Sequence, residues 1–179
     1  MAILGVDDFK SKLRGGGARP NLFKVTINFP GFAEGDAELT SFLCEAASLP
    51  GSTFGIIQVP FRGRILKMAG DRTFAEWTTT IINDTDFAVR KKLEDWMNTI
   101  NNLNTNVSVG GSAAGNITSY MGQMTVRQLG RGAEDEVLKS YTLLNCWPTT
   151  IAPIELNWDT RNEVETFDVT WRYTEFQIN

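Results

Sequence analysis

Ala69 to Trp77 reads AGDRTFAEW, and this stretch decides how the rest of the chain is interpreted. Glycine adopts the positive φ angles of tight turns and aspartate can bond to its own backbone, so Gly70 and Asp71 are predicted to form a turn. The turn would end one strand and lead into the next, which begins at the aromatic residue Phe74. Arg72 would then lie at an exposed corner, where its rigid guanidinium can hold a carboxylate on a neighbouring element or a neighbouring subunit.

The segment before this turn is predicted to be extended. Residues 54–59 and 61–68 are two apolar stretches joined at Pro60, which cannot donate to a central ladder, so an edge strand, a bend or a long hairpin fits. Arg62, Arg64 and Lys67 place three cations in this segment. Two interpretations stay open for them: solvated strand residues, or a contact surface.

Strict alternation in residues 22–29 predicts a half-buried strand, with apolar side chains on one face and polar side chains on the other. Similar patterns predict further strands over residues 42–47, 74–82, 120–129, 137–147 and 164–176, and polar loops over 30–38 and 101–119. One helix is predicted at about residues 84–102, capped by Asp84 or Thr85, because five apolar residues fall within one arc: Val89, Leu93, Trp96, Met97 and Ile100. The fold class is therefore mainly β, an antiparallel sandwich or partly open barrel of about eight strands with one packed helix.

Length and composition limit the function. With 179 residues the chain fits a single domain, predicted over residues 19–179, and a formal charge of −4 argues against tight charge-driven binding of nucleic acid. The sequence has no histidine, which removes the commonest metal ligand and the side chain most used for proton transfer near neutral pH. Cys44 and Cys146 stand far apart in the sequence and are predicted to be reduced core thiols.

Residues 1–18 are predicted to form a flexible arm, ending in the run Gly15-Gly16-Gly17. That run lacks the GxxxxGK[ST] pattern of a phosphate cradle. The acids Asp7 and Asp8 interrupt any apolar signal region, and no apolar stretch approaches the roughly 20 residues of a membrane span, so a cytoplasmic origin without membrane insertion is expected.

The acidic residues do not form a recognisable site. Those near the predicted helix are explained by solvation and by the helix dipole. Glu134-Asp135-Glu136 reads as a charged hairpin turn, since no EF-hand spacing is present. We therefore predict no catalytic, cofactor-binding or metal-binding residues, and no cofactor.

Several short runs, taken together, resemble the tail-tube protein of contractile-tailed bacteriophages, with a more distant similarity to tube proteins of type VI secretion. The runs span residues 18 to 174: Ala18 to Phe23, Ala69 to Phe74 with Trp77, Asn83-Asp84 before the helix with Trp96, Val126-Arg127-Gln128, Trp147-Pro148-Thr149, Trp158-Asp159, Asn162-Glu163 and Thr166 to Thr170. The order and spacing of these runs are more specific than any one of them.

The resemblance implies a non-enzymatic virion protein that is made in the host cytoplasm and forms six-fold rings stacked into a hollow tube inside a contractile sheath. Each subunit would add strands to a ring-wide inner β-barrel, with the helix outside and with loops or arms joining the rings. The implied partners are further copies of the chain, the tail sheath, baseplate, tail-terminator and tape-measure proteins, and then viral DNA in the lumen without sequence-specific binding.

The candidate residues for subunit and ring contacts are Asp71, Arg72, Arg62, Arg64, Gly15, Gly16, Gly17 and Arg19. Two other functions stay open: a tube subunit of a bacterial contractile injection or type VI secretion system, and a monomeric ligand-binding β-sandwich with Trp158 as a platform. For Trp158 itself, a packed or corner position is the favoured interpretation.

Overall fold

The structure is a computed structural model that describes residues 5–13, 17–31, 37–107, 117–132 and 136–179. Within these ranges the chain is mainly β, which confirms the predicted class. The strands are β1 (Phe23–Asn28), β2 (Cys44–Ala47), β3 (Ser52–Phe61), β4 (Arg64–Phe74), β5 (Trp77–Ile82), β6 (Gly122–Leu129), β7 (Val137–Ile151), β8 (Thr166–Arg172) and β9 (Glu175–Ile178). The helices are α1 (Val6–Lys12), α2 (Ala37–Leu43), α3 (Ala88–Ile100) and a short 3-10 helix, η2 (Ile117–Tyr120).

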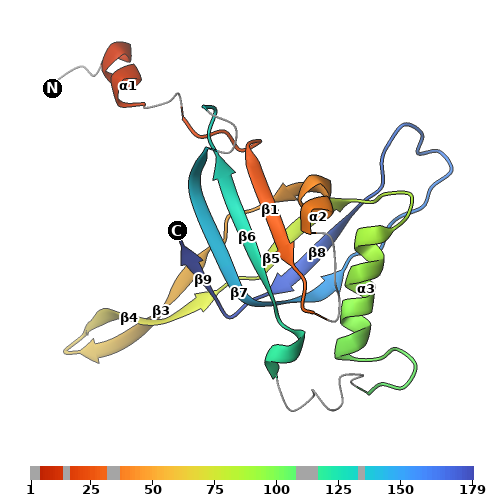
Figure 1. The fold of residues 1–179 in the computed structure, drawn as a ribbon. Helices are drawn as coiled ribbons and strands as arrows, with labels where there is room; N and C mark the ends of the chain where they lie inside the picture. Colours follow the sequence, from red (N-terminus) through yellow and green to blue (C-terminus); the bar gives the residue numbers. More distant parts are fainter. Residues whose placement is uncertain (1–4, 14–16, 32–36, 108–116, 133–135) are drawn as a thin grey trace.

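Strand β7 organises the body of the molecule because it belongs to two antiparallel sheets. Its first part pairs with β6 on one side and with β9 on the other, and β6 pairs in turn with β1. Its last part pairs with β8, which continues through β5 to β2. The full order is β1-β6-β7-β8-β5-β2, with β9 beside β7, and Figure 1 shows the sheets wrapping around a common interior.

The passage of β7 from one sheet to the other occurs near Asn145. This residue has a positive φ of 56°, which asparagine tolerates better than most residues. The register with β6 shifts at the same place, between the pairs Gly122–Cys146 and Met124–Leu143. Such irregularities bend a strand, so they allow β7 to turn from the first sheet into the second.

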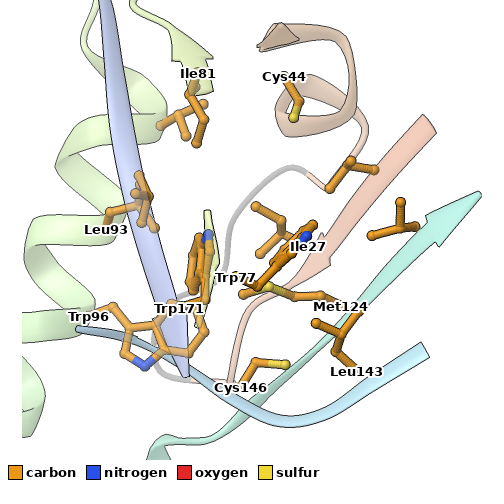
Figure 2. Close-up of a cluster of buried hydrophobic side chains, with 14 of the residues drawn as sticks. Ile27, Cys44, Trp77, Ile81, Leu93, Trp96, Met124, Leu143, Cys146 and Trp171 are labelled. Carbon is orange, nitrogen blue, oxygen red and sulfur yellow. The ribbon is translucent and has the colours of Figure 1, made fainter. Parts of the chain in front are cut away.

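Three tryptophans from three elements form the centre of the core, and each satisfies its indole N–H. Trp77 donates to the Ser48 carbonyl at 2.6 Å, Trp96 donates to the Tyr120 carbonyl at 2.8 Å, and Trp171 donates to the Thr79 hydroxyl at 3.0 Å. Figure 2 shows them among the aliphatic and sulfur-containing side chains of both sheets. Buried indoles are stable when the N–H has such a partner.

The predicted helix is α3, and it packs its apolar stripe against the sheets. Val89, Leu93 and Trp96 are buried, and the Trp96 ring lies 5.8 Å from that of Trp171 between centroids. The backbone N–H of Ala88 donates to the Asp84 carboxylate at 2.9 Å, so Asp84 satisfies one of the free amides at the start of the helix, as predicted.

Both cysteines are free and buried, as expected of core thiols. Burial raises the pKa of Cys44 to about 12. Burial also raises the pKa of Cys146 to about 12, although a hydrogen bond from the Met124 backbone acts in the opposite direction.

Three predicted elements differ from the structure. Phe42 and Leu43 belong to α2 and not to a strand, and the final strand is divided into β8 and β9 around Tyr173-Thr174. Residues Val6–Lys12, inside the predicted arm, form α1, which has no buried residue.

The predicted turn at Gly70-Asp71 is wrong. Both residues lie inside β4, and the chain reverses earlier, at Arg62-Gly63. Residues 52–74 therefore form one long β3–β4 hairpin, which confirms one of the three forms left open for this segment, and its reversal lies at Arg62-Gly63, whereas Pro60 pairs with Ile65.

Candidate subunit interface

The β3–β4 hairpin projects away from the sheets as a separate two-stranded ribbon (Figure 1). In the described part of the chain its strands pair only with each other. Eight apolar side chains on it are between 40 and 66% exposed: Phe54, Ile56, Ile57, Val59, Phe61, Ile65, Leu66 and Met68. An isolated two-stranded ribbon is at best marginally stable in water, so this amount of exposed apolar surface indicates a partner.

The register divides the hairpin into two different faces. Ile57 lies opposite Met68 and Val59 lies opposite Leu66, so these four side chains share one face. Phe61 extends this face toward the tip. We call the five residues Ile57, Val59, Phe61, Leu66 and Met68 the apolar face of the hairpin. The opposite face is mixed, because it carries the polar pair Gln58–Lys67.

The tip of the hairpin is a two-residue turn. Arg62 and Gly63 both have positive φ angles, of 46° and 81°, as the favoured two-residue hairpin turn requires. The guanidinium carbon of Arg62 lies 5.3 Å from the centroid of the Phe61 ring. Arg64 begins the returning strand, so two of the predicted contact residues stand together at the tip.

The base of the hairpin contains a β-bulge. Phe54 pairs with Arg72 and Ile56 pairs with Ala69, which leaves Gly70 and Asp71 opposite the single residue Gly55. A Cβ atom on Gly70 would lie 3.2 Å from the carbonyl carbon and oxygen of Gly55, so this glycine permits the close approach of the two backbones. The sequence signal at Gly70-Asp71 was therefore real, but it marks a bulge instead of a turn.

Arg72 lies at this base with its guanidinium carbon 4.6 Å from the centroid of the Phe54 ring. Asp71 and Arg72 are both exposed. The hairpin as a whole carries four cations, Arg62, Arg64, Lys67 and Arg72, against the single acid Asp71, a net charge of +3 in a chain whose total is −4.

The remaining predicted contact residues lie elsewhere. Arg19 precedes β1, and its carbonyl oxygen accepts hydrogen bonds from the Gln128 side chain at 2.7 Å and from the Leu22 amide at 3.2 Å. Together with Gly17 it lines a cleft of about 400 Å³ next to the β6–β7 connection. Gly15 and Gly16 lie outside the described residues. The structure thus separates the candidates into a hairpin group and an arm group.

A second exposed surface lies in the connection between β7 and β8 and was not predicted from the sequence. Eleven of the residues between Pro153 and Thr166 line a cleft of about 690 Å³. Trp158 stands in a turn of this loop and is 98% exposed, so of the packed or corner position predicted for it, the packed alternative is wrong and the corner alternative fits. The run of acids around it, Glu155, Asp159, Glu163 and Glu165, is the sequence signal that could have indicated a surface.

In the parts of the chain that the structure describes, no group of three or more Cys, Asp or Glu side chains is placed to hold a metal ion. Among the described helices, none is both long enough and apolar enough to span a membrane.

Comparisons with known proteins agree with an assembly role. Residues 18–179 match the model of the family described as phage tail tube protein. The tail tube protein gp19 of Enterobacteria phage T4 is 36% identical over 166 residues, which cover 92% of this chain and 94% of that protein. The tail tube protein of Serratia phage KSP90 is 32% identical over 173 residues, 94% of this chain and 93% of that one.

The fold is also similar to a chain in the sheath-tube complex of PVC, an extracellular contractile injection system, in its extended state. The TM-score is 0.65 over 95% of this chain and 96% of the other, at 15% identity. With a family model that matches nearly the whole sequence, and with relatives above 30% identity over more than nine-tenths of it, this chain belongs to the phage tail tube protein family.

Proposed function

We propose that this chain is the structural subunit of the inner tube of a contractile phage tail, assembling into six-fold rings that stack into a hollow conduit for viral DNA. The observation that supports this most directly is the exposed apolar face of the β3–β4 hairpin. Family membership supports the same function and places the protein in the tail of the virion.

The hairpin argument is energetic. Each large apolar side chain that becomes fully buried contributes about 1.5–3 kcal/mol, so the five side chains of the apolar face would supply much of the free energy of a subunit contact. When the hairpin of one copy docks on the body of a neighbouring copy, the two surfaces in contact are different. Such a contact is head-to-tail, and a series of head-to-tail contacts that closes makes a ring.

Open sheet edges support the idea of a shared barrel. In the described part of the chain β1 pairs only with β6, β2 only with β5, and β9 only with β7. Edge strands invite pairing with another chain, and closure of a barrel across subunits removes them. We propose that these edge strands pair with strands of neighbouring subunits and so close a ring-wide inner β-barrel.

Sheath, baseplate and tail-terminator proteins are the external partners of such a tube, with the tape-measure protein and then DNA inside it. A conduit works best when it does not hold its cargo, and each lysine or arginine that grips a phosphate adds affinity through counterion release. The net charge of −4 suits the passage of DNA. A strongly basic bore in an assembled tube would contradict this part of the proposal.

The second candidate function is the tube of a bacterial contractile injection system. The observation that favours it is the fold shared with the PVC sheath-tube complex. Neighbouring genes separate the two, because capsid and portal genes accompany a phage tail whereas secretion genes accompany an injection system.

The test is electron microscopy of the purified protein combined with a mass measurement, using two matched variants. Val59→Asp places a charge on the apolar face of the hairpin, and Gln58→Asp places the same charge one residue away on the opposite face. We expect six-fold rings or tubes from the wild type and from Gln58→Asp, and folded monomers from Val59→Asp. A wild-type protein that remains a compact monomer at high concentration would overturn the proposal and favour a monomeric ligand-binding sandwich.

A further inference from the structure

The connection between β7 and β8 is a loop whose two ends are held by hydrogen bonds to the second sheet and to Asn83. The Ala152 amide donates to the Asp168 carbonyl at 2.8 Å, and the Asn83 amide donates to the Glu165 carbonyl at the same distance. The Asn83 side chain also donates to the Glu165 carboxylate at 2.9 Å. The loop therefore starts and ends at fixed points on the second sheet.

The interior of the loop has its own hydrogen bonds. The Asn157 side-chain oxygen accepts from the Asp159 amide at 3.0 Å, and the Thr160 amide donates to the Asn157 carbonyl at 3.3 Å. These bonds form a turn that holds Trp158 at its outermost point. The exposure of this indole thus follows from the turn together with the two anchors of the loop.

The loop presents large apolar side chains that no described part of the chain covers. Leu156, Trp158 and Val164 are 81, 98 and 70% exposed, and all three line the cleft of about 690 Å³. Exposed tryptophan beside a cleft is characteristic of binding surfaces, because tryptophan is among the residues that contribute most to protein interfaces. We call residues 153–166 the acidic loop.

The charge of the acidic loop is opposite to that of the hairpin. The loop contains Glu155, Asp159, Glu163 and Glu165 against the single cation Arg161, a net charge of −3, whereas the hairpin carries +3. Both surfaces combine exposed apolar side chains with charges of one prevailing sign. Complementary charge of this kind selects a partner and fixes its orientation.

The two surfaces also lie at opposite ends of the molecule. In Figure 1 the hairpin extends to the lower left, while the blue connection between β7 and β8 extends to the upper right. Because of this separation we consider a contact between two copies, which a head-to-tail assembly requires.

We propose that the β3–β4 hairpin of one copy docks on the acidic loop of a second copy, a contact that rests on the tube assembly proposed above. The tip cations Arg62 and Arg64 meet the carboxylates of Glu155 and Glu163, and a guanidinium stacks on the Trp158 ring. Phe61 and Leu66, which share the apolar face of the hairpin, cover Leu156 and Val164. The site is therefore an interaction surface whose partner is this same chain.

The first test reverses charges on each side. Arg62→Glu with Arg64→Glu, and separately Glu155→Lys with Glu163→Lys, are each expected to raise the concentration needed for assembly about tenfold or more. Combining all four changes should recover most of the loss, because the charges again match. Asp86→Lys, an exposed acid outside both surfaces, is the matched control and should assemble like the wild type. Circular dichroism confirms that each variant is folded.

The second test is intermolecular cross-linking. Protein carrying Leu66→Cys is mixed with protein carrying Leu156→Cys and oxidised under assembly conditions, and a covalent dimer of one chain of each kind is expected. Replacing Leu156→Cys by Thr85→Cys, an exposed position elsewhere, should give none. The native thiols do not interfere, since both are buried.

The outcomes separate the two proposals. If the wild type assembles but the charge exchange does not rescue it and no cross-link forms, the docking contact is refuted while the tube remains. If the wild type does not assemble under any condition, both are refuted. Rescue together with the specific cross-link would establish the contact.

Discussion

Arg72 stacks on Phe54 across the base of the hairpin, with 4.6 Å between the guanidinium carbon and the ring centroid. Arg72 is exposed, so the N–H groups of its guanidinium can still donate to a carboxylate. Arg72 can therefore pack on Phe54 within the hairpin and bind a carboxylate of another subunit at the same time. A cation over an aromatic ring at an exposed site contributes about 0.5–1 kcal/mol.

This stacking gives a first prediction. Arg72→Ala and Phe54→Ala should each weaken assembly, and the double variant should lose less than the sum of the two, with a coupling of about 0.5–1 kcal/mol. Critical concentrations from sedimentation provide the measurement. Asp71→Lys, at the adjacent bulge position, tests whether the neighbouring acid takes part. If Asp71→Lys and Arg72→Ala both assemble normally, this corner has no role between subunits.

The bulge glycine gives a second prediction. In Gly70→Ala the new Cβ meets the Gly55 backbone at 3.2 Å, so the two strands must move apart at the base of the hairpin. We expect a several-fold higher critical concentration with little change in the unfolding of the sheets. Gly51→Ala is the control, because its Cβ would have no neighbour within 4 Å. Equal behaviour of the two variants would contradict the role of the bulge.

A third prediction concerns the core. In Gly122→Ala the added Cβ would lie 2.6 Å from the Asn28 carbonyl oxygen and 2.8 Å from the Trp96 ring, both of which are held by packing. The free energy of unfolding should fall by about 1–3 kcal/mol, which denaturant titration of the subunit measures. Gly31→Ala, with open space around its Cβ, should leave that free energy unchanged.

The buried thiols predict a loss of stability in alkali. The pKa of both cysteines is raised from 9.0 to about 12, so the unfolded chain releases these protons at a lower pH than the folded one does. Their contribution is fully present below pH 9 and is lost as the pH rises from about 9 toward about 12, at about 1.4 kcal/mol per pH unit for each thiol. Denaturation curves recorded across this range provide the measurement.

Replacing the thiols tests their share of that slope. Cys44→Ala and Cys146→Ala should each make the alkaline loss shallower, whatever they do to stability at pH 7. Native protein at pH 8 should also react slowly with a thiol reagent and quickly once unfolded. An unchanged slope in the double variant would assign the alkaline loss to other groups.

The arm provides the last prediction. Helix α1 contributes no buried residue, so removing residues 1–17 should leave the unfolding midpoint nearly unchanged and should slow or shorten tube growth. Thermal unfolding and tube lengths from micrographs measure the two effects separately. A truncated protein that cannot fold would place the arm in the core of the domain.

The strands and helix with strong periodicity were predictable from the sequence. The alternation of β1, the polar and apolar faces of β5 and β8, and the apolar stripe of α3 all appear in the structure with the expected burial. These patterns are local, and burial on one side of an element follows directly from them.

The errors arose where the outcome depends on a distant segment. Gly70-Asp71 forms a bulge because β3 supplies a single residue opposite the pair, and nothing within β4 specifies this. Helix α2 has only seven residues, too few to show a helical period. A packed position was one of the two predicted for Trp158, and its exposure depends both on the turn that contains it and on how the second sheet anchors the ends of the loop. The exposed surface of residues 153–166 was missed for the same reason.

The continuity of β7 has a mechanical consequence for a tube that must transmit force. Because one polypeptide passes through both sheets at Asn145, a pull on either sheet is carried to the other along covalent bonds and ladder hydrogen bonds. In a sandwich whose sheets meet only through side chains, the same load would shear the core. The subunit should therefore resist a force applied along β7 more strongly than a force that separates its two sheets.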